Sequence, residues 1–246
     1  MFRLEHVSKR FGDTLALARL SHEFQKGQTT VLIGPSGCGK STLLRLCIGL
    51  LPTDTGSISF DGTKLGPATL TEMRHRVGYV IQEGGLFPHL TAFQNAALLP
   101  RRLGWSKEQT RRRAGELADV LRLDKKLLDR FPLELSGGQR QRVGLMRALM
   151  TDPDALLMDE PLGALDPMIR AELQEHLTAL FRDLNRTVIL VTHDLGEAGL
   201  FADEILLLRR GHVIQKGTLK DLVRTPADDF VTAFVNAQRS PLESIR

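Results

Sequence analysis

A glycine-rich segment in the first fifth of the chain has the residue types and spacing of a loop that binds nucleotide phosphates. It consists of Gly34, Pro35, Ser36, Gly37, Cys38, Gly39, Lys40, Ser41 and Thr42. An apolar run precedes it and a helical pattern follows, which is the context such loops require. Backbone N–H groups can approach the phosphates, Lys40 can reach the β- and γ-phosphates, and the Ser41 hydroxyl suits Mg²⁺. An accidental match occurs in roughly one chain in a hundred, so we expect nucleotide and Mg²⁺ rather than a plain glycine turn.

Two adjacent carboxylates, Asp159 and Glu160, follow the apolar run 155–158. We expect this run to be a strand that ends at the sheet edge where ligands bind in open α/β folds. Asp159 can then enter the Mg²⁺ shell, and Glu160 can polarise a water for attack on the γ-phosphate. The alternative is that the pair caps a following helix, but the phosphate loop favours the catalytic interpretation.

Gln82 and His193 occupy equivalent places after the apolar runs 77–81 and 187–192. A lone Gln or His is more often a satisfied polar residue. Because both follow strands that should end at the same edge, we expect contacts to the γ-phosphate and the attacking water.

A second segment suited to an anion runs from Leu135 to Arg142 and reads LSGGQRQR. It is a polar, glycine-rich turn that opens a basic helix. One nucleotide needs only one phosphate loop, so the residues alone leave open what this second segment would hold.

The alternation of short apolar runs with longer helical patterns predicts an α/β domain around a largely parallel sheet. We expect its core strands at 29–33, 77–81, 155–158, 187–191 and 204–208. Runs at 2–7, 15–24 and 57–60 alternate more and predict a smaller antiparallel sheet. No strand pattern occurs from 83 to 150, where Ser106 and Gln109 indicate a capping box for a helix that runs to about Leu123. The expected single domain therefore has a catalytic lobe at 1–82 and 151–246 and a helical lobe at 83–150.

Composition sets limits on the surroundings and partners of the chain. No apolar run approaches the roughly 18 to 20 residues that span a bilayer, and polar residues interrupt any signal-peptide core. Cys38 and Cys47 lie about 13 Å apart along one helix, beyond disulfide reach, so we expect reduced thiols. The net charge of +4 is offset by 29 acids, so we expect no nucleic-acid partner. The run of arginines at 111–113 is better explained as a solvated helix face than as a partner contact.

With LSGGQ between the phosphate loop and the Asp-Glu strand, the whole chain resembles the ATP-binding-cassette (ABC) ATPases. This resemblance implies ATP and Mg²⁺ as cofactors and two cassettes, in a homodimer or with a second cassette, packed head to tail. The second anion site then closes on the partner's ATP through Ser136, Gly137, Gly138 and Gln139. The resemblance also implies that Phe11 stacks on adenine, that His193 contacts the γ-phosphate, and that Gln82 couples Mg²⁺ and water to the helical lobe.

Two other features of the resemblance concern segments beside the carboxylates and after Gln82. Ala164-Leu165-Asp166 matches the loop that crosses to the partner cassette, although Gly163 stands where many members have serine. The segment after Gln82 is similar to importer cassettes that receive a coupling helix of the permease, and Leu86, Phe87 and Leu90 would be its apolar contacts. The alternative is that they pack the two lobes together.

Coiled coils and a duplicate cassette, typical of ABC ATPases in chromosome organisation or translation, are not evident in the sequence. We therefore expect a transporter subunit, peripheral on the cytoplasmic face of the membrane, that works with permease subunits and indirectly with an extracytoplasmic solute-binding protein. Residues 79–89 and 161–167 look closest to importers of glycine betaine, carnitine and choline, although the regulatory domains of some members are not expected after Gly217. The alternatives are import of an amino acid or other small solute, lipid-related export, and a soluble non-transport ATPase.

Overall fold

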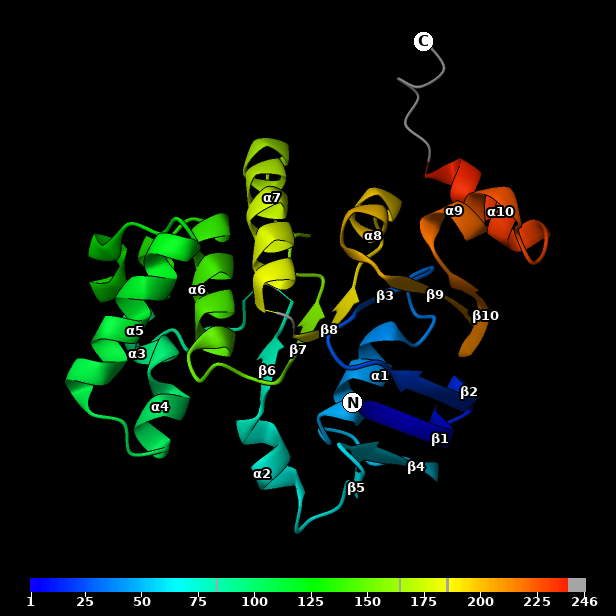
Figure 1. Ribbon diagram of the computed structural model, residues 1–246, viewed down its shortest axis with the longest axis horizontal. Helices are drawn as coiled ribbons and strands as arrows, with labels where there is room; N and C mark the ends of the chain where they lie inside the picture. The colour runs from blue at the N-terminus through cyan, green and yellow to red at the C-terminus, as the bar shows by residue number, and fades with distance from the viewer. Residues whose placement is uncertain (83, 164, 185, 239–246) are drawn as a thin grey trace. The chain divides into compact units, whose positions relative to one another are not determined.

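A computed structural model describes residues 1–82, 84–163, 165–184 and 186–238 (Figure 1). The chain forms two compact units, one made of Met1–Thr69 with Ile189–Arg246 and the other of Leu70–Val188. Each unit is described by itself. The division into lobes at 82/83 and 150/151 stays a prediction.

The first unit contains the antiparallel sheet that the alternating N-terminal runs predict. Its strand order is β2-β1-β4-β5, with β1 (Phe2–Phe11), β2 (Thr14–Phe24), β4 (Thr55–Phe60) and β5 (Thr63–Lys64). Phe2 is opposite Phe24 on one side and Phe60 on the other. These three side chains are almost fully buried, so the inward positions of the alternating pattern form an aromatic core.

A parallel strand pair in the same unit holds the phosphate loop. Strand β3 (Thr29–Ile33) pairs in parallel with β9 (Glu204–Arg209), and β10 (His212–Gly217) extends this sheet antiparallel to β9. The helices of this unit are α1 (Lys40–Cys47), α8 (Leu195–Phe201), α9 (Leu219–Arg224) and α10 (Asp229–Ala237). All of β3 is buried, as expected for a parallel strand covered on both faces. Cys38 and Cys47 are free thiols, as predicted.

The second unit combines a parallel strand pair with helices. Strand β6 (Val77–Val80) pairs in parallel with β7 (Ala155–Asp159). The α-helices are α2 (Leu70–His75), α3 (Ala92–Ala96), α4 (Leu98–Arg102), α5 (Lys107–Val120), α6 (Gly137–Leu149) and α7 (Pro167–Leu184). Two 3₁₀ helices, η1 (Lys125–Asp129) and η2 (Pro132–Glu134), precede α6. Among the described residues of 84–150 there is no strand, which confirms the helical expectation for this part.

Strand β8 (Thr187–Val191) begins in the second unit and ends in the first, and has the predicted bounds. Several predicted bounds were wrong. Strands β1, β7 and β9 extend beyond their predicted ends, to Phe11, Asp159 and Arg209, and strands β2 and β4 begin earlier, at Thr14 and Thr55. Strand β6 stops at Val80 rather than 81, and Ile81 is 40% exposed. Helix α5 ends at Val120 rather than near Leu123, because Arg122 has a positive φ of 47° that no helix continues. Strands β5 and β10 were missed, since neither has a continuous apolar run.

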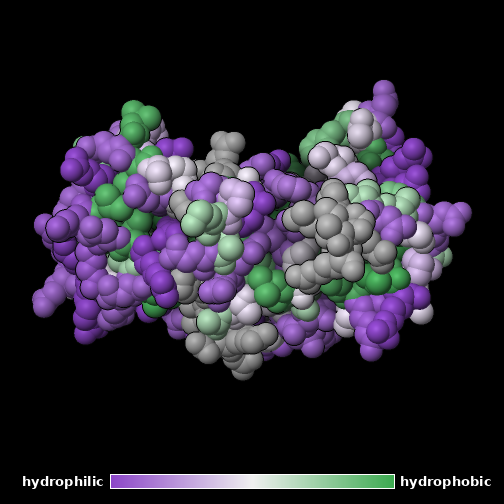
Figure 2. All heavy atoms as spheres, turned by 90° about the horizontal axis from the view of Figure 1, so that it is seen from above, coloured by the Kyte–Doolittle hydropathy of each residue, from purple (hydrophilic) through white to green (hydrophobic). Residues whose placement is uncertain are grey.

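None of the described helices is both long and apolar enough to cross a membrane. On the face shown in Figure 2, hydrophobic residues form several small patches in a mostly hydrophilic surface.

Candidate functional site

The phosphate loop leaves β3 and ends at the first residue of α1, within the first unit. The Lys40 side chain is buried and folds back over the loop, donating from Nζ to the Gly34 carbonyl at 2.7 Å and to the Pro35 carbonyl at 3.1 Å. Pro35, Ser36 and Gly37 are exposed. The ammonium is thus held over an open loop, where phosphate oxygens can replace the two carbonyls as its acceptors.

The N-terminus of α1 has no side-chain cap, since its N-cap residue is Gly39. Helices α3, α6 and α9 each have a complete capping box, supplied by Thr91, Ser136 and Thr218. The first N–H groups of a helix need an acceptor and carry a partial positive charge. An anion such as a phosphate group supplies what the sequence of α1 leaves out.

Two glycines of the loop are required by close backbone approach as well as by conformation. A Cβ on Gly34, at φ 142°, would lie 2.2 Å from the Leu208 carbonyl oxygen, and one on Gly39, at φ 111°, would lie 2.3 Å from that of Ala16. The loop therefore packs tightly on the strands below it. Burial, opposed by the nearby Lys40, raises the pKa of the Cys38 thiol, which disfavours the reactive thiolate form.

His193 follows β8 on a backbone that is fixed on both sides. Before it, the Thr192 N–H donates to the Leu32 carbonyl of β3, and the Thr192 hydroxyl donates to the Glu197 carboxylate at 2.6 Å. After it, Asp194 caps α8 by accepting from the Gly196 and Glu197 N–H groups. The exposed His193 side chain thus projects from a rigid segment.

Phe11 ends β1 in the first unit with 49% of its surface exposed, and the Lys9 ammonium lies 5.7 Å from its ring centroid. An exposed ring can stack on adenine, although its role stays a prediction.

The two carboxylates lie in the second unit, where Asp159 ends β7 and Glu160 follows. Asp159 is buried, and Glu160 has a positive φ of 47°. Such a conformation is strained for a non-glycine residue and persists only when the surroundings impose it. The Gln82 side-chain amide donates to Glu160 Oε2 at 3.4 Å, so the structure brings these two predicted residues together.

The LSGGQ segment forms a capped helix start. Ser136 Oγ accepts from the Gln139 N–H, and Gln139 Oε1 accepts from the Ser136 N–H at 2.9 Å. Gln139 is therefore committed to the backbone, while the Ser136 hydroxyl proton and the N–H groups of Gly137 and Gly138 remain suited to an anion.

Helix α6, which LSGGQ opens, is tied to both neighbouring segments. The Gln141 amide donates to the Glu160 carbonyl at 3.5 Å, and the Arg147 guanidinium donates to the Gly84 and Gly85 carbonyls at 2.9 and 2.8 Å. Burial lowers the pKa of Arg147, and a Cβ on Gly144 would lie 3.0 Å from Gly84. Motion of the segment after Gln82 must therefore involve this helix, a link that no sequence motif indicated.

The described part of the segment after Gln82 presents Phe87 to solvent from a backbone fixed by one buried side chain. Asn95 is fully buried; its Oδ1 accepts from the Phe87 N–H at 2.8 Å, and its Nδ2 donates to the carbonyls of Phe87, Leu90 and Thr91. Phe87 is 48% exposed, while Leu86 and Leu90 are half-buried. Asn95 was missed by the sequence analysis, since a lone Asn carries no signal.

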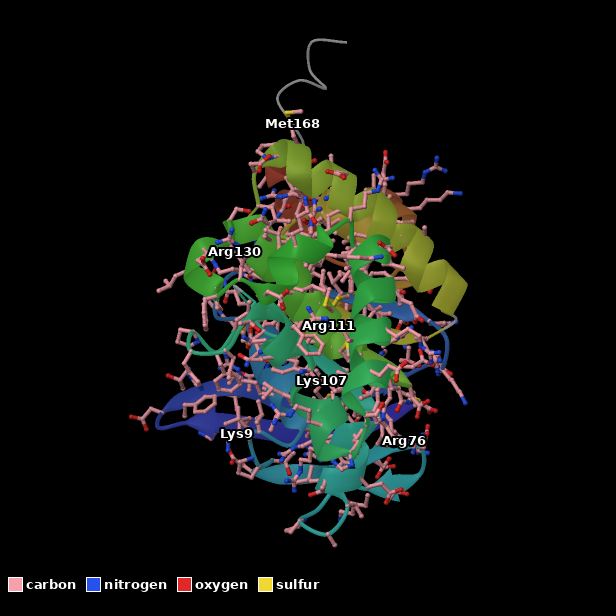
Figure 3. All side chains as sticks on the ribbon, turned by 90° about the vertical axis from the view of Figure 1, so that its left-hand side faces the viewer. Lys9, Arg76, Lys107, Arg111, Arg130 and Met168 are labelled. Carbon is pink, nitrogen blue, oxygen red and sulfur yellow. The ribbon has the colours of Figure 1, made fainter. Side chains whose placement is uncertain are left out.

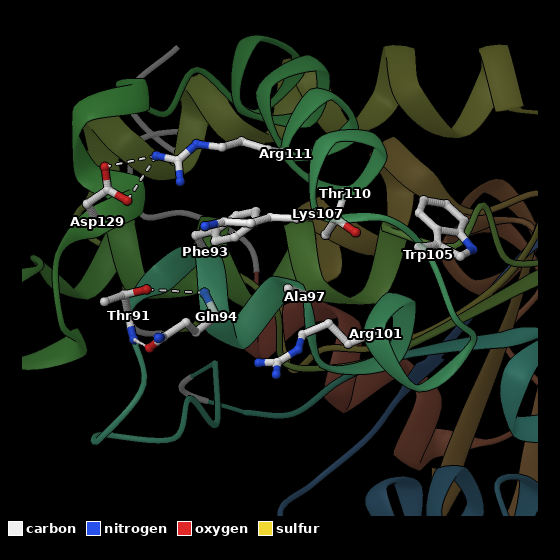
Figure 4. Close-up of a pocket in the computed structure, with 10 residues that line it drawn as sticks. All are labelled: Thr91, Phe93, Gln94, Ala97, Arg101, Trp105, Lys107, Thr110, Arg111 and Asp129. Carbon is white, nitrogen blue, oxygen red and sulfur yellow. Dashed lines mark hydrogen bonds and ion pairs between the residues drawn. The ribbon is translucent and has the colours of Figure 1, made fainter.

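Arg111 and Arg112 are exposed, as predicted for a solvated helix face, and Arg111 and Arg113 also make specific contacts. Arg111 makes two hydrogen bonds with Asp129 and lies 5.0 Å over the Phe93 ring, and Arg113 donates to the Leu149 carbonyl. Arg111 lines a hollow of about 620 Å³ together with Arg101, Trp105 and Lys107 (Figure 4). Figure 3 shows the side chains of this part of the molecule as sticks, with Arg111 and Lys107, two of the residues that line the hollow, labelled. No predicted site residue lines this hollow.

The ABC transporter family model matches residues 17–163. The chain belongs to the ABC transporter family. Among curated relatives of this ABC cassette, the glycine betaine/carnitine/choline transport ATP-binding protein OpuCA of Bacillus subtilis is 44% identical over 97% of the chain. The glycine betaine uptake system ATP-binding protein YehX of Escherichia coli is 46% identical, over 95% of the chain and 76% of the relative. The cassette spans only 63% of the length of OpuCA.

A dimeric bacterial ABC transporter cassette of known structure superposes with a TM-score of 0.83 at 33% identity, covering 89% of this chain and 99% of that one. The α/β ABC ATPase fold is thereby confirmed. The roles of the individual site residues in this cassette stay predictions, and Ala164 lies outside the described residues.

We expect Asn95→Asp to destabilise the ABC cassette by about 2–4 kcal/mol, because a carboxylate would face the three carbonyls that the amide now serves in a buried place. Urea unfolding measures the change. Gln94→Glu is the matched control: Gln94 uses only its amide oxygen, accepting from the Thr91 N–H at 2.9 Å, so a carboxylate keeps that bond. Equal stability of the two variants would contradict the assigned role of Asn95.

Proposed function

We propose that this chain is the ATP-hydrolysing subunit of a membrane ABC importer. The observation that carries the proposal is the pair formed by the uncapped N-terminus of α1 and the Lys40 ammonium held over the exposed loop. Together they provide N–H donors and a cation for the phosphates of ATP, while the Ser41 hydroxyl and the Asp159 carboxylate are suited to Mg²⁺.

Glu160 is the proposed base for hydrolysis. Its position after β7, its imposed backbone conformation and its contact with Gln82 favour a carboxylate held ready for a water molecule. Gln82 and His193 are proposed to sense whether the γ-phosphate is present. Gln82 would pass a change in its position to helix α6 through the Gly84–Arg147 contact. His193 would pass a change in its position to the first unit.

We further propose that LSGGQ acts on the nucleotide of a second cassette. Ser136, Gly137 and Gly138 form a capped helix start whose donors are oriented for an anion. Charge neutralisation across the interface then drives closure of a dimer with two MgATP, and the fact that the related cassette of known structure is dimeric supports the pairing of two cassettes.

Glu160→Gln should bind ATP normally, lose about 10²–10⁴-fold in hydrolysis rate, and accumulate as a dimer with MgATP. Light scattering at high protein concentration measures the mass. The double variant Lys40→Ala/Glu160→Gln is the control and should remain monomeric. A Glu160→Gln chain that binds MgATP and stays monomeric would rule out the composite site.

Association with a permease is proposed at the surface formed by Leu86, Phe87 and Leu90. An exposed aromatic ring on a backbone fixed by Asn95 is suited to receive an apolar segment of a partner. Because Arg147 joins the same backbone to α6, loss of the γ-phosphate can move this surface as a rigid element. Such a subunit would lie at the cytoplasmic face of the membrane.

The proposed cargo is a quaternary-ammonium osmoprotectant, since the names of OpuCA and YehX give glycine betaine transport for those proteins. An amino acid or another small solute is the alternative cargo, and lipid-related export or a soluble ATPase would be different functions.

The test is uptake into ATP-loaded vesicles that contain the permease and solute-binding protein encoded beside this gene. We expect uptake of betaine or choline that requires the cassette, with solute recognition in an aromatic cage by cation–π attraction. Phe87→Asp should abolish uptake while ATP hydrolysis by the isolated cassette survives, and Phe131→Asp, a change at another exposed ring, should leave uptake intact. Uptake of an amino acid alone would overturn the cargo assignment, and absence of any cassette-dependent transport would favour the soluble ATPase.

A further inference from the structure

The side chain of Gln238 bridges the backbone on both sides of Asp194. Its amide Nε2 donates to the His193 carbonyl at 2.7 Å, and its Oε1 accepts from the Leu195 N–H at 3.0 Å. Gln238 is the C-cap residue of α10 and lies 45 residues beyond His193 in the sequence. Both polar ends of one amide are therefore used on the loop that carries His193.

Helix α10, which ends at Gln238, is anchored by several contacts. Val231 and Val235 are buried, Asp228 caps the helix by accepting from the Val231 N–H at 2.9 Å, and the Arg209 guanidinium lies 4.2 Å from the Phe230 ring centroid. These contacts fix the helix within the first unit. Because Gln238 is the C-cap residue of α10, its side chain moves with this helix.

The bridge adds a constraint that the other anchors of the loop do not supply. Thr192 fixes the chain before His193 and Asp194 fixes the start of α8 after it. Gln238 holds the carbonyl of His193 itself, and thereby the peptide plane that joins His193 to Asp194. The orientation of this plane affects where the exposed imidazole points.

We propose that Gln238 is a positioning residue that aims His193 at the γ-phosphate and makes hydrolysis depend on the seating of α10. This inference rests on the proposed ATPase function and extends it to helix α10. A displacement of α10 would release the His193 peptide and slow hydrolysis while the phosphate loop continues to bind ATP.

Gln238→Ala should lower kcat by about tenfold, the scale of one lost oriented contact in the transition state, with KM for ATP changed less than about twofold. Gln238→Glu distinguishes the bond to the His193 carbonyl from the bond to the Leu195 N–H. An ionised carboxylate still accepts from the Leu195 N–H but has no proton for the His193 carbonyl, so kcat should fall at least as far as in Gln238→Ala.

Gln215→Ala is the matched control. The Gln215 amide also bridges backbone groups, donating to the Thr225 carbonyl at 3.0 Å and accepting from the Ala227 N–H at 2.8 Å, within the same unit but on the segment before α10. The Gln215→Ala change removes comparable bonds without touching the His193 loop. Because α10 keeps its Asp228 cap and its buried Val231 and Val235, kcat should stay at the wild-type value.

Hydrogen exchange at the Leu195 amide tests the bridge independently of catalysis. Exchange should accelerate in Gln238→Ala and remain at the wild-type rate in Gln238→Glu and Gln215→Ala. A wild-type chain without ATPase activity would refute the proposed function, while the exchange result would still test the bridge. Wild-type kcat in both Gln238 variants, an equal loss in Gln215→Ala, or unchanged exchange in Gln238→Ala would overturn the inference.

Discussion

The N-terminus of α1, which has no side-chain cap, is the constraint on which the rest of the proposed nucleotide site depends. A helix start without a cap carries N–H groups that need an acceptor, and here the residue that would provide it is a glycine pressed against the Ala16 carbonyl. Lys40 adds a buried cation whose acceptors are the carbonyls of its own loop. A phosphate group can accept from both the N–H groups and the ammonium, and the close packing of Gly34 on Leu208 and of Gly39 on Ala16 fixes the loop that presents these donors.

Helix α6 has the complementary arrangement in the second unit. Its N-terminus is satisfied by Ser136 and Gln139, so it does not need an anion to be stable. Further along the helix, Gln141 contacts the Glu160 carbonyl and Arg147 donates to the backbone after Gln82. The N-terminus of α1 lacks a side-chain cap and that of α6 has a complete one, a difference that fits the proposal that LSGGQ acts on the nucleotide of a second cassette.

Features determined by neighbouring residues could be predicted from the sequence. The phosphate loop, the all-apolar strands β3 and β8 and the Ser106 cap depend on short stretches whose chemistry is local. Asn95, Arg147 and Gln238 could not be predicted, because their functions consist of hydrogen bonds to backbone groups that only the folded chain brings within reach. The positive φ of Glu160 is likewise imposed by its surroundings rather than by its residue type.

The claim that LSGGQ serves the nucleotide of the other chain is tested most directly by mixing two inactive variants. Lys40→Ala removes the phosphate cation, and Gly137→Asp places a carboxylate where the partner's γ-phosphate would lie, while an acid in the first turn of α6 suits its helix dipole. Each variant alone has two defective composite sites, but a mixed dimer has one site with Lys40 and Gly137 both intact. Mixing equal amounts should restore about a quarter of the wild-type ATPase rate, if chains pair at random and sites act independently. A mixture no more active than its components, with both variants folded and Gly137→Asp still binding ATP, would contradict the composite site.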